Sequence, residues 1–171
     1  MINIRSNIFE TNSSSSHAIV INNAGTHVKN YNNLNIVDGV YTISNGLEFG
    51  RAPFRMLTTV STKLRFVIAS LASFYVNGPE AFMDELVNIC KKHYPELKTI
   101  KLTANDYYDG YGYIDHQSDG LLDKFLNKHN ISIEDFIFNP KYIVIIDGDE
   151  YCEFSTLVEL NLISDKFETE D

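Results

Sequence analysis

Apolar residues that recur at spacings of three and four predict a helix after Pro53. They form one stripe, the pattern of a helix that lies with one face on a sheet, and comprise Leu57, Val60, Leu64, Val67, Ile68, Leu71 and Phe74. A second helix is predicted from Pro79, because proline suits the first helical turn. One face of it, which continues as far as Tyr94-Pro95, carries Phe82, Leu86, Ile89 and His93. The pattern therefore predicts two main amphipathic helices.

Two shorter helices are predicted further along the chain. The first is amphipathic, with its apolar side chains at Leu121, Leu122, Phe125 and Leu126. The second follows Ser132, whose hydroxyl suits an N-cap, and contains Phe136 and Ile137. Asn139-Pro140 ends it, because proline cannot continue a helix. A further cap at Ser155 predicts a helix through Leu157, Leu160 and Ile163.

Runs of β-branched and aromatic residues predict the strands. Residues 2–9 and 17–21 flank a polar stretch and are placed to pair across it. Residues 36–44 form another run, which Asp38-Gly39 interrupts, and Asn45-Gly46 predicts a turn after it. Residues 98–102 alternate charged and apolar side chains, as an exposed strand does, and lead into a run rich in Tyr and Gly.

The most apolar run, Tyr142 to Ile146, is typical of a central strand. Asp147-Gly148 predicts a hairpin that joins it to Tyr151, Cys152 and Phe154. The fold class expected is α+β: a mixed or antiparallel β-sheet with the two main helices and the shorter ones packed on it.

Length and composition favour a single domain. The chain has 171 residues, of which 44% are apolar and 12% aromatic, enough for one buried core. We expect one α+β domain over residues 1–164 and a frayed acidic tail over residues 165–171.

Charge and cysteine content narrow the classes of partner. Asp and Glu number 23 against 14 Lys and Arg, a formal charge of −9, which disfavours extensive contact with nucleic acid. Two cysteines are too few for a disulfide framework and indicate a reducing compartment. No apolar run is long enough to span a bilayer, and the N-terminal residues lack the apolar core of a signal peptide. A cytoplasmic location without membrane contact is expected.

The first candidate site is a polar segment close to Met1, Phe9-Glu10-Thr11-Asn12-Ser13-Ser14-Ser15-Ser16-His17. Short hydroxyl and amide side chains bend the backbone into turns whose amides can converge on a phosphate or carboxylate oxygen. A histidine beside them can act as a base or a donor near neutral pH. We predict ligand contacts from Asn12, Ser13, Ser14 and Ser15 and proton transfer by His17; the alternative is a serine linker with a surface histidine.

The second candidate segment is Gly112-Tyr113-Ile114-Asp115-His116-Gln117-Ser118. It follows a strand and precedes a helix, a position at which sheets often present functional groups. Asp115 and His116 are predicted to be catalytic, with Asp115 orienting a histidine, and Gln117 and Ser118 to contact the ligand. The alternative is a helix cap in which these side chains bind free backbone amides.

Three further groups are weaker candidates. Asp147-Gly148-Asp149-Glu150 holds three carboxylates but lacks the ligand spacing of a calcium loop, so a hairpin turn explains it. Cys90 and His93 lie one helical turn apart without a second pair, and no metal is predicted. Basic residues that a phosphate could meet fall into two groups, Arg51 with Arg55, and Lys91, Lys92, Lys98 and Lys101. Whether a cofactor takes part stays open from the sequence.

Three segments in order, the polar segment at 9–17, Tyr113-Ile114-Asp115-His116-Gln117-Ser118 and Phe136-Ile137-Phe138-Asn139, resemble a group of uncharacterised bacteriophage and prophage proteins. They span most of the chain. The resemblance implies a viral or mobile-element origin in a bacterial host, and it implies no activity. It also implies that the first two segments meet in space as one pocket.

Two functions remain open from the sequence. The first is a phage accessory protein whose polar pocket binds a phosphate-bearing or nucleotide-like small molecule, with group transfer or hydrolysis as the chemistry considered. The second is a non-enzymatic acidic inhibitor that binds a host or anti-phage defence protein. Whether the protein is an enzyme stays open.

Overall fold

The computed structural model describes residues 16–21, 34–50, 55–103, 111–114 and 120–147. These residues form helices and short strands in one α+β arrangement, which confirms the predicted fold class. Within them, no helix has both the length and the apolar character needed to cross a membrane.

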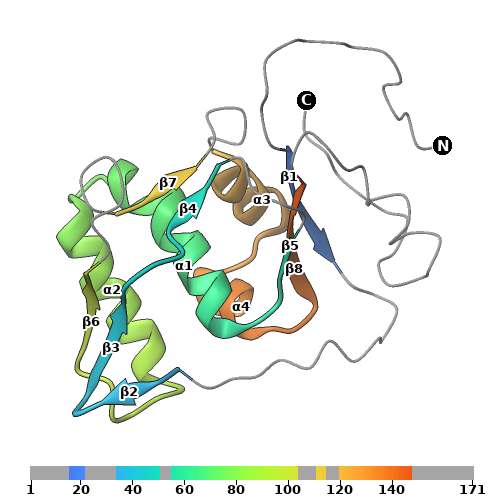
Figure 1. The fold of residues 1–171 in the computed structure, drawn as a ribbon. Helices are drawn as coiled ribbons and strands as arrows, with labels where there is room; N and C mark the ends of the chain where they lie inside the picture. The colour runs from blue at the N-terminus through green and yellow to red at the C-terminus, as the bar shows by residue number, and fades with distance from the viewer. Residues whose placement is uncertain (1–15, 22–33, 51–54, 104–110, 115–119, 148–171) are drawn as a thin grey trace, which may run out of the picture.

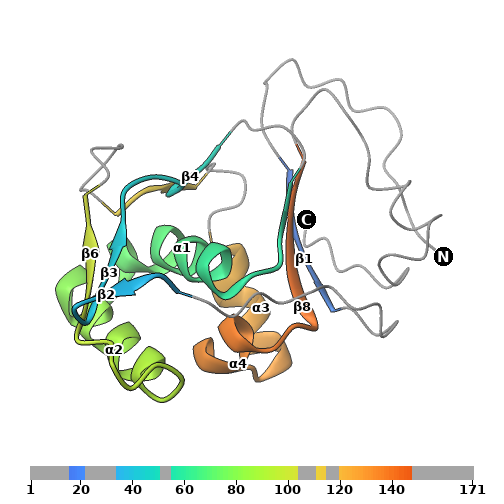
Figure 2. The ribbon, with the colours of Figure 1, turned by 60° about the horizontal axis from the view of Figure 1, so that its bottom comes forward.

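Helix α1 (Val60–Leu71) lies in the middle of the described fold. Strands flank it on several sides and α3 and α4 lie against it, as Figures 1 and 2 show. It begins where Thr59 and Thr62 form a capping box, each side chain accepting from the other's backbone N–H. Because it is surrounded, its buried residues cover more than one stripe, and they are Val60, Lys63, Leu64, Phe66, Val67, Ile68 and Ala69.

One sheet has the strand order β1-β8-β5 and is antiparallel throughout. It consists of β1 (Ser16–Ile21), β8 (Tyr142–Asp147) and β5 (Arg55–Leu57). Val144 and Ile146 of β8 belong to the core around α1, whereas Ile143 and Ile145 alternate with them and are also buried. A strand buried on both faces has no polar side to show, which explains the continuous apolar run.

A second sheet has the order β2-β3-β6. Strands β2 (Ile36–Val37) and β3 (Val40–Ile43) form a hairpin, and β6 (Thr99–Leu102) pairs parallel with β3. The hairpin turn has positive φ at both Asp38 and Gly39, as a two-residue primed turn requires. A two-residue parallel pair, β4 (Glu48–Phe49) with β7 (Tyr113–Ile114), lies beside α1.

The remaining helices lie around this frame. The 3-10 turn η1 (Ala72–Phe74) follows α1, and α2 (Pro79–Lys91) packs on β6 with Pro79 in its first turn. Helix α3 (Leu121–His129) ends at Asn130, which adopts the left-handed conformation. Helix α4 (Ile133–Phe138) is capped by Ser132, whose hydroxyl accepts from the Asp135 N–H at 3.0 Å, as predicted.

The helix predicted from Leu57 to Phe74 was wrong at both ends. Leu57 belongs to β5, because Arg55 to Leu57 pair with β8, and the helix begins only after the Thr59 cap. At the other end α1 stops at Leu71, and the Phe74 side chain is 68% exposed. Tertiary pairing overrode a helical spacing that happened to include one strand residue.

Strands β1 and β5 pair with both edges of β8 at Val144 to Ile146, and the second half of the hairpin predicted after Asp147 lies outside the described residues. Several other predicted elements lie outside the described residues: the strand at 2–9, the strand at 151–154, the helix after Ser155 and the acidic tail.

Candidate functional site

Only His17 among the predicted site residues lies within the described part of the chain, and there the structure describes its backbone. Asn12, Ser13, Ser14, Ser15, Asp115, His116, Gln117 and Ser118 lie outside the described residues. The strands next to them are described: β1 begins directly after the first segment, and β7 ends directly before the second. In both Figure 1 and Figure 2 these two strand ends lie toward the top of the molecule.

Strand pairing places His17 in one row with Arg55. His17 pairs with Ile146 of the central strand, and Ile146 pairs with Arg55 on its other side. Neighbouring strands are about 4.8 Å apart, so the His17 and Arg55 backbones are about 10 Å apart. The sheet thus brings together a predicted catalytic residue and a cation that are far apart in the sequence.

The Arg55 guanidinium is partly buried and only partly bonded. One terminal nitrogen donates to the Glu48 carbonyl at 2.6 Å, and the guanidinium carbon lies 5.1 Å from the centre of the Phe49 ring. Its Nε is buried and has no hydrogen-bond partner in the structure. Burial lowers the pKa of Arg55 by desolvation, but an arginine stays charged at neutral pH. This cation therefore retains bonding capacity.

Arg65 of α1 is a second arginine with an unpartnered Nε in the described part of the chain. Its Nη1 would lie 2.9 Å from a Cβ at Gly46, so the guanidinium packs where a side chain is missing. Its Nε is also buried without a hydrogen-bond partner. The ion pairs found in the described residues involve neither Arg55 nor Arg65.

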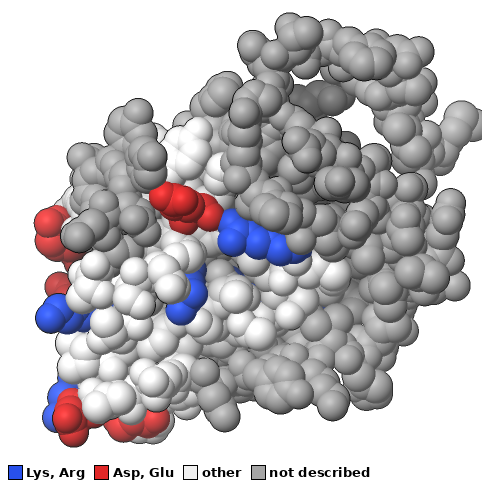
Figure 3. Space-filling model, viewed as in Figure 1, with Lys and Arg blue, Asp and Glu red and all other residues white. Residues whose placement is uncertain are grey.

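Figure 3 shows basic side chains over the part of the surface where α1, β4 and β5 lie, with an acidic side chain beside them. In these three elements the basic residues are Arg55, Lys63 and Arg65, and Lys63 is buried. An acidic protein thus has a local site with the sign of charge that a phosphate requires.

The Cys90 and His93 pair is not arranged as a metal site. Cys90 is buried, and desolvation raises the pKa of its thiol to about 12, which opposes thiolate formation. The His93 ring stacks on Phe138 at 3.6 Å, and its Nε2 lies 3.1 Å from Oε1 of Glu134. Hydrogen bonds from Lys92 and His93 lower the pKa of Glu134. Within the described ranges, no three metal-binding side chains cluster.

The segment Phe136-Ile137-Phe138-Asn139 has packing duties. Phe136 and Ile137 are fully buried, and the Asn139 carbonyl accepts from the Lys63 ammonium at 2.8 Å. The Asn139 side-chain amide also donates to Asp135 at 3.1 Å. These contacts explain this segment without a role in a site.

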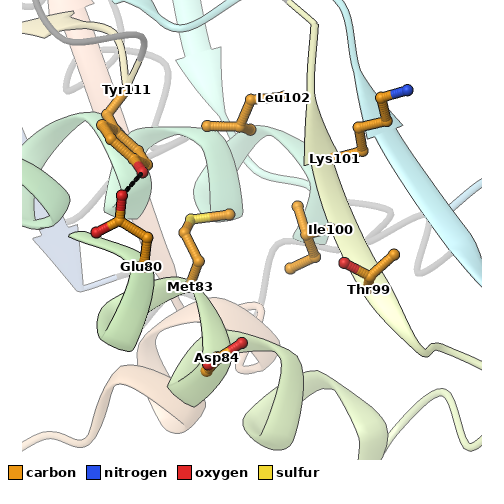
Figure 4. Close-up of a pocket in the computed structure, with 8 residues that line it drawn as sticks. All are labelled: Glu80, Met83, Asp84, Thr99, Ile100, Lys101, Leu102 and Tyr111. Atoms are coloured by element: carbon orange, nitrogen blue, oxygen red, sulfur yellow. Dashed lines mark hydrogen bonds between the residues drawn. The ribbon is translucent and has the colours of Figure 1, made fainter.

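A groove of about 560 Å³ lies between α2 and β6, where the sequence predicted no site (Figure 4). Glu80, Met83 and Asp84 project into it from α2, and Tyr111 closes one end with its hydroxyl 3.5 Å from Oε1 of Glu80. Ile100 and Leu102 face it from β6, whereas Lys101 points to the other face of the strand.

The predicted basic cluster at the end of α2 is dispersed. Lys92 bonds to Glu134, the aliphatic part of Lys98 packs over Gly39, and Lys101 lies on β6. Sequence reasoning missed the groove because its members come from an exposed helix face and a separate strand. The four-residue spacing of Glu80 and Asp84 was the available signal, but charged pairs on helix surfaces are common.

No match to the chain was found among protein-family models, curated proteins or solved structures.

Proposed function

We propose that this chain is a phage-encoded accessory protein that binds a phosphate-bearing or nucleotide-like ligand where β1 and β5 begin. Arg55 contacts the anion, and His17 lies beside it as a proton donor or acceptor. The proposal rests on one observation: Arg55, with an unpartnered Nε, shares a sheet row with His17.

The chemistry of arginine supports an anionic ligand. A guanidinium offers five N–H donors in a planar fork that matches phosphate oxygens, and partial desolvation strengthens such bonds. Arg55 uses one terminal nitrogen on the Glu48 carbonyl, which holds the side chain in place while leaving other donors available. A preorganised arginine loses less side-chain entropy when it binds.

The remaining predicted residues extend the proposal. Asn12 and the hydroxyls of Ser13, Ser14 and Ser15 immediately precede β1 and would add neutral donors to the anion. Asp115, His116, Gln117 and Ser118 follow β7, whose end lies on the same side of the molecule as the start of β1. Their participation is part of the proposal, as are the phage origin and the location in the bacterial cytoplasm.

The Nε–Hε signal of Arg55 in a ¹⁵N NMR spectrum tests this function directly. Titration with ADP and with pyrophosphate should shift this signal, because a phosphate oxygen accepts a hydrogen bond from the Nε or from another nitrogen of the same guanidinium. Adenosine, which lacks phosphate, should shift it much less. The Arg55→Gln and His17→Ala variants should each bind ADP about tenfold more weakly, the loss expected for one charge-assisted hydrogen bond.

Lys124→Gln is the matched control, because Lys124 is an exposed cation on α3 that is not part of this row. It should bind ADP like the parent protein. Unchanged Arg55 signals with both phosphate probes would show that the arginine only ties β5 to β4. A large loss of thermal stability in Arg55→Gln together with unchanged ADP affinity would lead to the same conclusion.

A further inference from the structure

Strand β6 forms the outer edge of its sheet in the described part of the chain. It pairs with β3 on one side, and no described strand pairs with its other side. Figures 1 and 2 both show it at the margin of the molecule. An open edge presents backbone N–H and C=O groups that can pair with an added strand.

The groove beside this edge has a definite chemistry. Its floor is apolar, with Ile100 buried and Met83 and Leu102 partly buried. Its wall carries the exposed carboxylates of Glu80 and Asp84 on α2. Figure 4 shows Glu80 toward the Leu102 end of β6 and Asp84 toward the Thr99 end, so the two acids follow the strand.

We propose that this groove binds an extended segment of a partner protein that adds a strand to β6, with basic side chains at two alternate positions. This groove is separate from the proposed phosphate site, which lies on other elements. Backbone pairing with β6 supplies general affinity, and the acidic wall selects the sequence.

The spacing of the two carboxylates matches that of an extended strand. Residues four apart on a helix are separated by about 6 Å along its axis. Alternate residues of a strand, which point to the same face, are about 6.7 Å apart. Two lysines or arginines at positions n and n+2 can thus face Glu80 and Asp84 together, with their aliphatic stems over Met83 and Leu102.

Lys101 defines the position between the two basic residues. It points to the opposite face of β6, where the intervening side chain of an added strand would also lie. Opposite charges across paired strands are favourable. The partner segment should therefore read basic, acidic, basic, with β-branched residues at its ends.

Selection from a library of short random peptides, with counter-selection against the Glu80→Gln, Asp84→Asn double variant, tests this inference. Basic residues at alternate positions should be enriched. In fluorescence anisotropy the selected peptide should bind the double variant about tenfold more weakly than the parent. The control double variant Glu96→Gln, Asp123→Asn removes two exposed carboxylates elsewhere and should bind like the parent.

Backbone methylation of the peptide distinguishes strand addition from simple charge attraction. N-methylation removes one backbone N–H of the peptide, so it should abolish binding in the register in which the N–H of the intervening residue pairs with β6. The amide signals of Lys101 and Leu102 should shift on titration with the unmodified peptide. Enrichment without basic residues, shifts confined to other elements, or self-association through β6 would each overturn the proposal, the last because a second copy would be the occupant.

Discussion

Lys63 is the buried charged residue in the part of the chain that the structure describes. Its side chain has no exposed surface, and its ammonium donates to the Asn139 carbonyl and lies 6.0 Å from the centre of the Phe136 ring. Desolvation lowers its pKa from 10.5 to about 8, against an opposing effect of Asp135. The hydrogen bond from Lys63 links α1 to the end of α4, whereas burial of the side chain disfavours its protonated form.

Stability should therefore rise with pH because of Lys63. Between the folded pKa of about 8 and the unfolded value of 10.5, the unfolded state binds more protons, so the free energy of unfolding increases with pH. Relative to Lys63→Met, which cannot titrate, the parent protein should gain about 2 kcal/mol between about pH 7 and about pH 10. Urea denaturation of both proteins at each pH measures the difference, and parallel profiles would contradict the buried amine.

At the scale of the element, the boundary between β5 and α1 is the informative feature. Five residues, Arg55 to Thr59, contain strand β5 and a helix cap, whereas the apolar spacing alone runs through them without a break. The Thr59 and Thr62 hydroxyls satisfy backbone donors that the first helical turn leaves free. The helix therefore begins at the cap and not at the first apolar residue.

Phe66 of α1 and Phe74 of η1 should respond differently to substitution by alanine. Phe66 is buried and makes an edge-to-face contact with Phe49, at 5.3 Å between ring centres. Phe66→Ala should cost about 3–5 kcal/mol of unfolding free energy through lost burial and a cavity. Phe74→Ala should cost less than about 0.5 kcal/mol, because this side chain is mostly exposed. Equal losses of unfolding free energy in the two variants, measured by urea denaturation, would instead support one buried apolar stripe that extends to Phe74.

At the scale of the molecule, three small groups of strands in the described part of the chain pack against helices. The pairs β4 with β7 and β2 with β3 are short, whereas β8 is paired along both edges and buried on both faces. Short strands contribute few bonds by themselves and gain their stability from packing, β4 and β7 on α1 and β6 on α2. Cooperativity should therefore be highest at the β8 and α1 interface.

Hydrogen exchange should reveal this gradient. Amides of Val144 to Ile146 should exchange only through global unfolding, whereas those of Tyr113 and Ile114 should exchange about 100-fold faster through local opening. Residue-resolved exchange by NMR measures both rates. Slow exchange of β7 at the rate of β8 would mean that the fold opens as one unit.

Much of the fold followed from local patterns. The Ser132 cap, the stop at Asn139-Pro140 and the central strand all rest on short-range rules, and the structure contains each of them. The candidate site was much less predictable from the sequence than the fold. All its predicted residues except His17 lie outside the described part, and Arg55 lies near His17 only because their strands pair with the two edges of β8.

By itself, the sequence determined local features such as the Ser132 cap and the central strand, since dihedral preferences, caps and turns act within a few residues. Only the tertiary structure decided that Leu57 belongs to a strand, that α1 is surrounded, that Arg55 shares a row with His17 and that Glu80 and Asp84 border an open edge. The reason is physical: strand pairing and burial join residues far apart in the chain, and their energies depend on which partners meet.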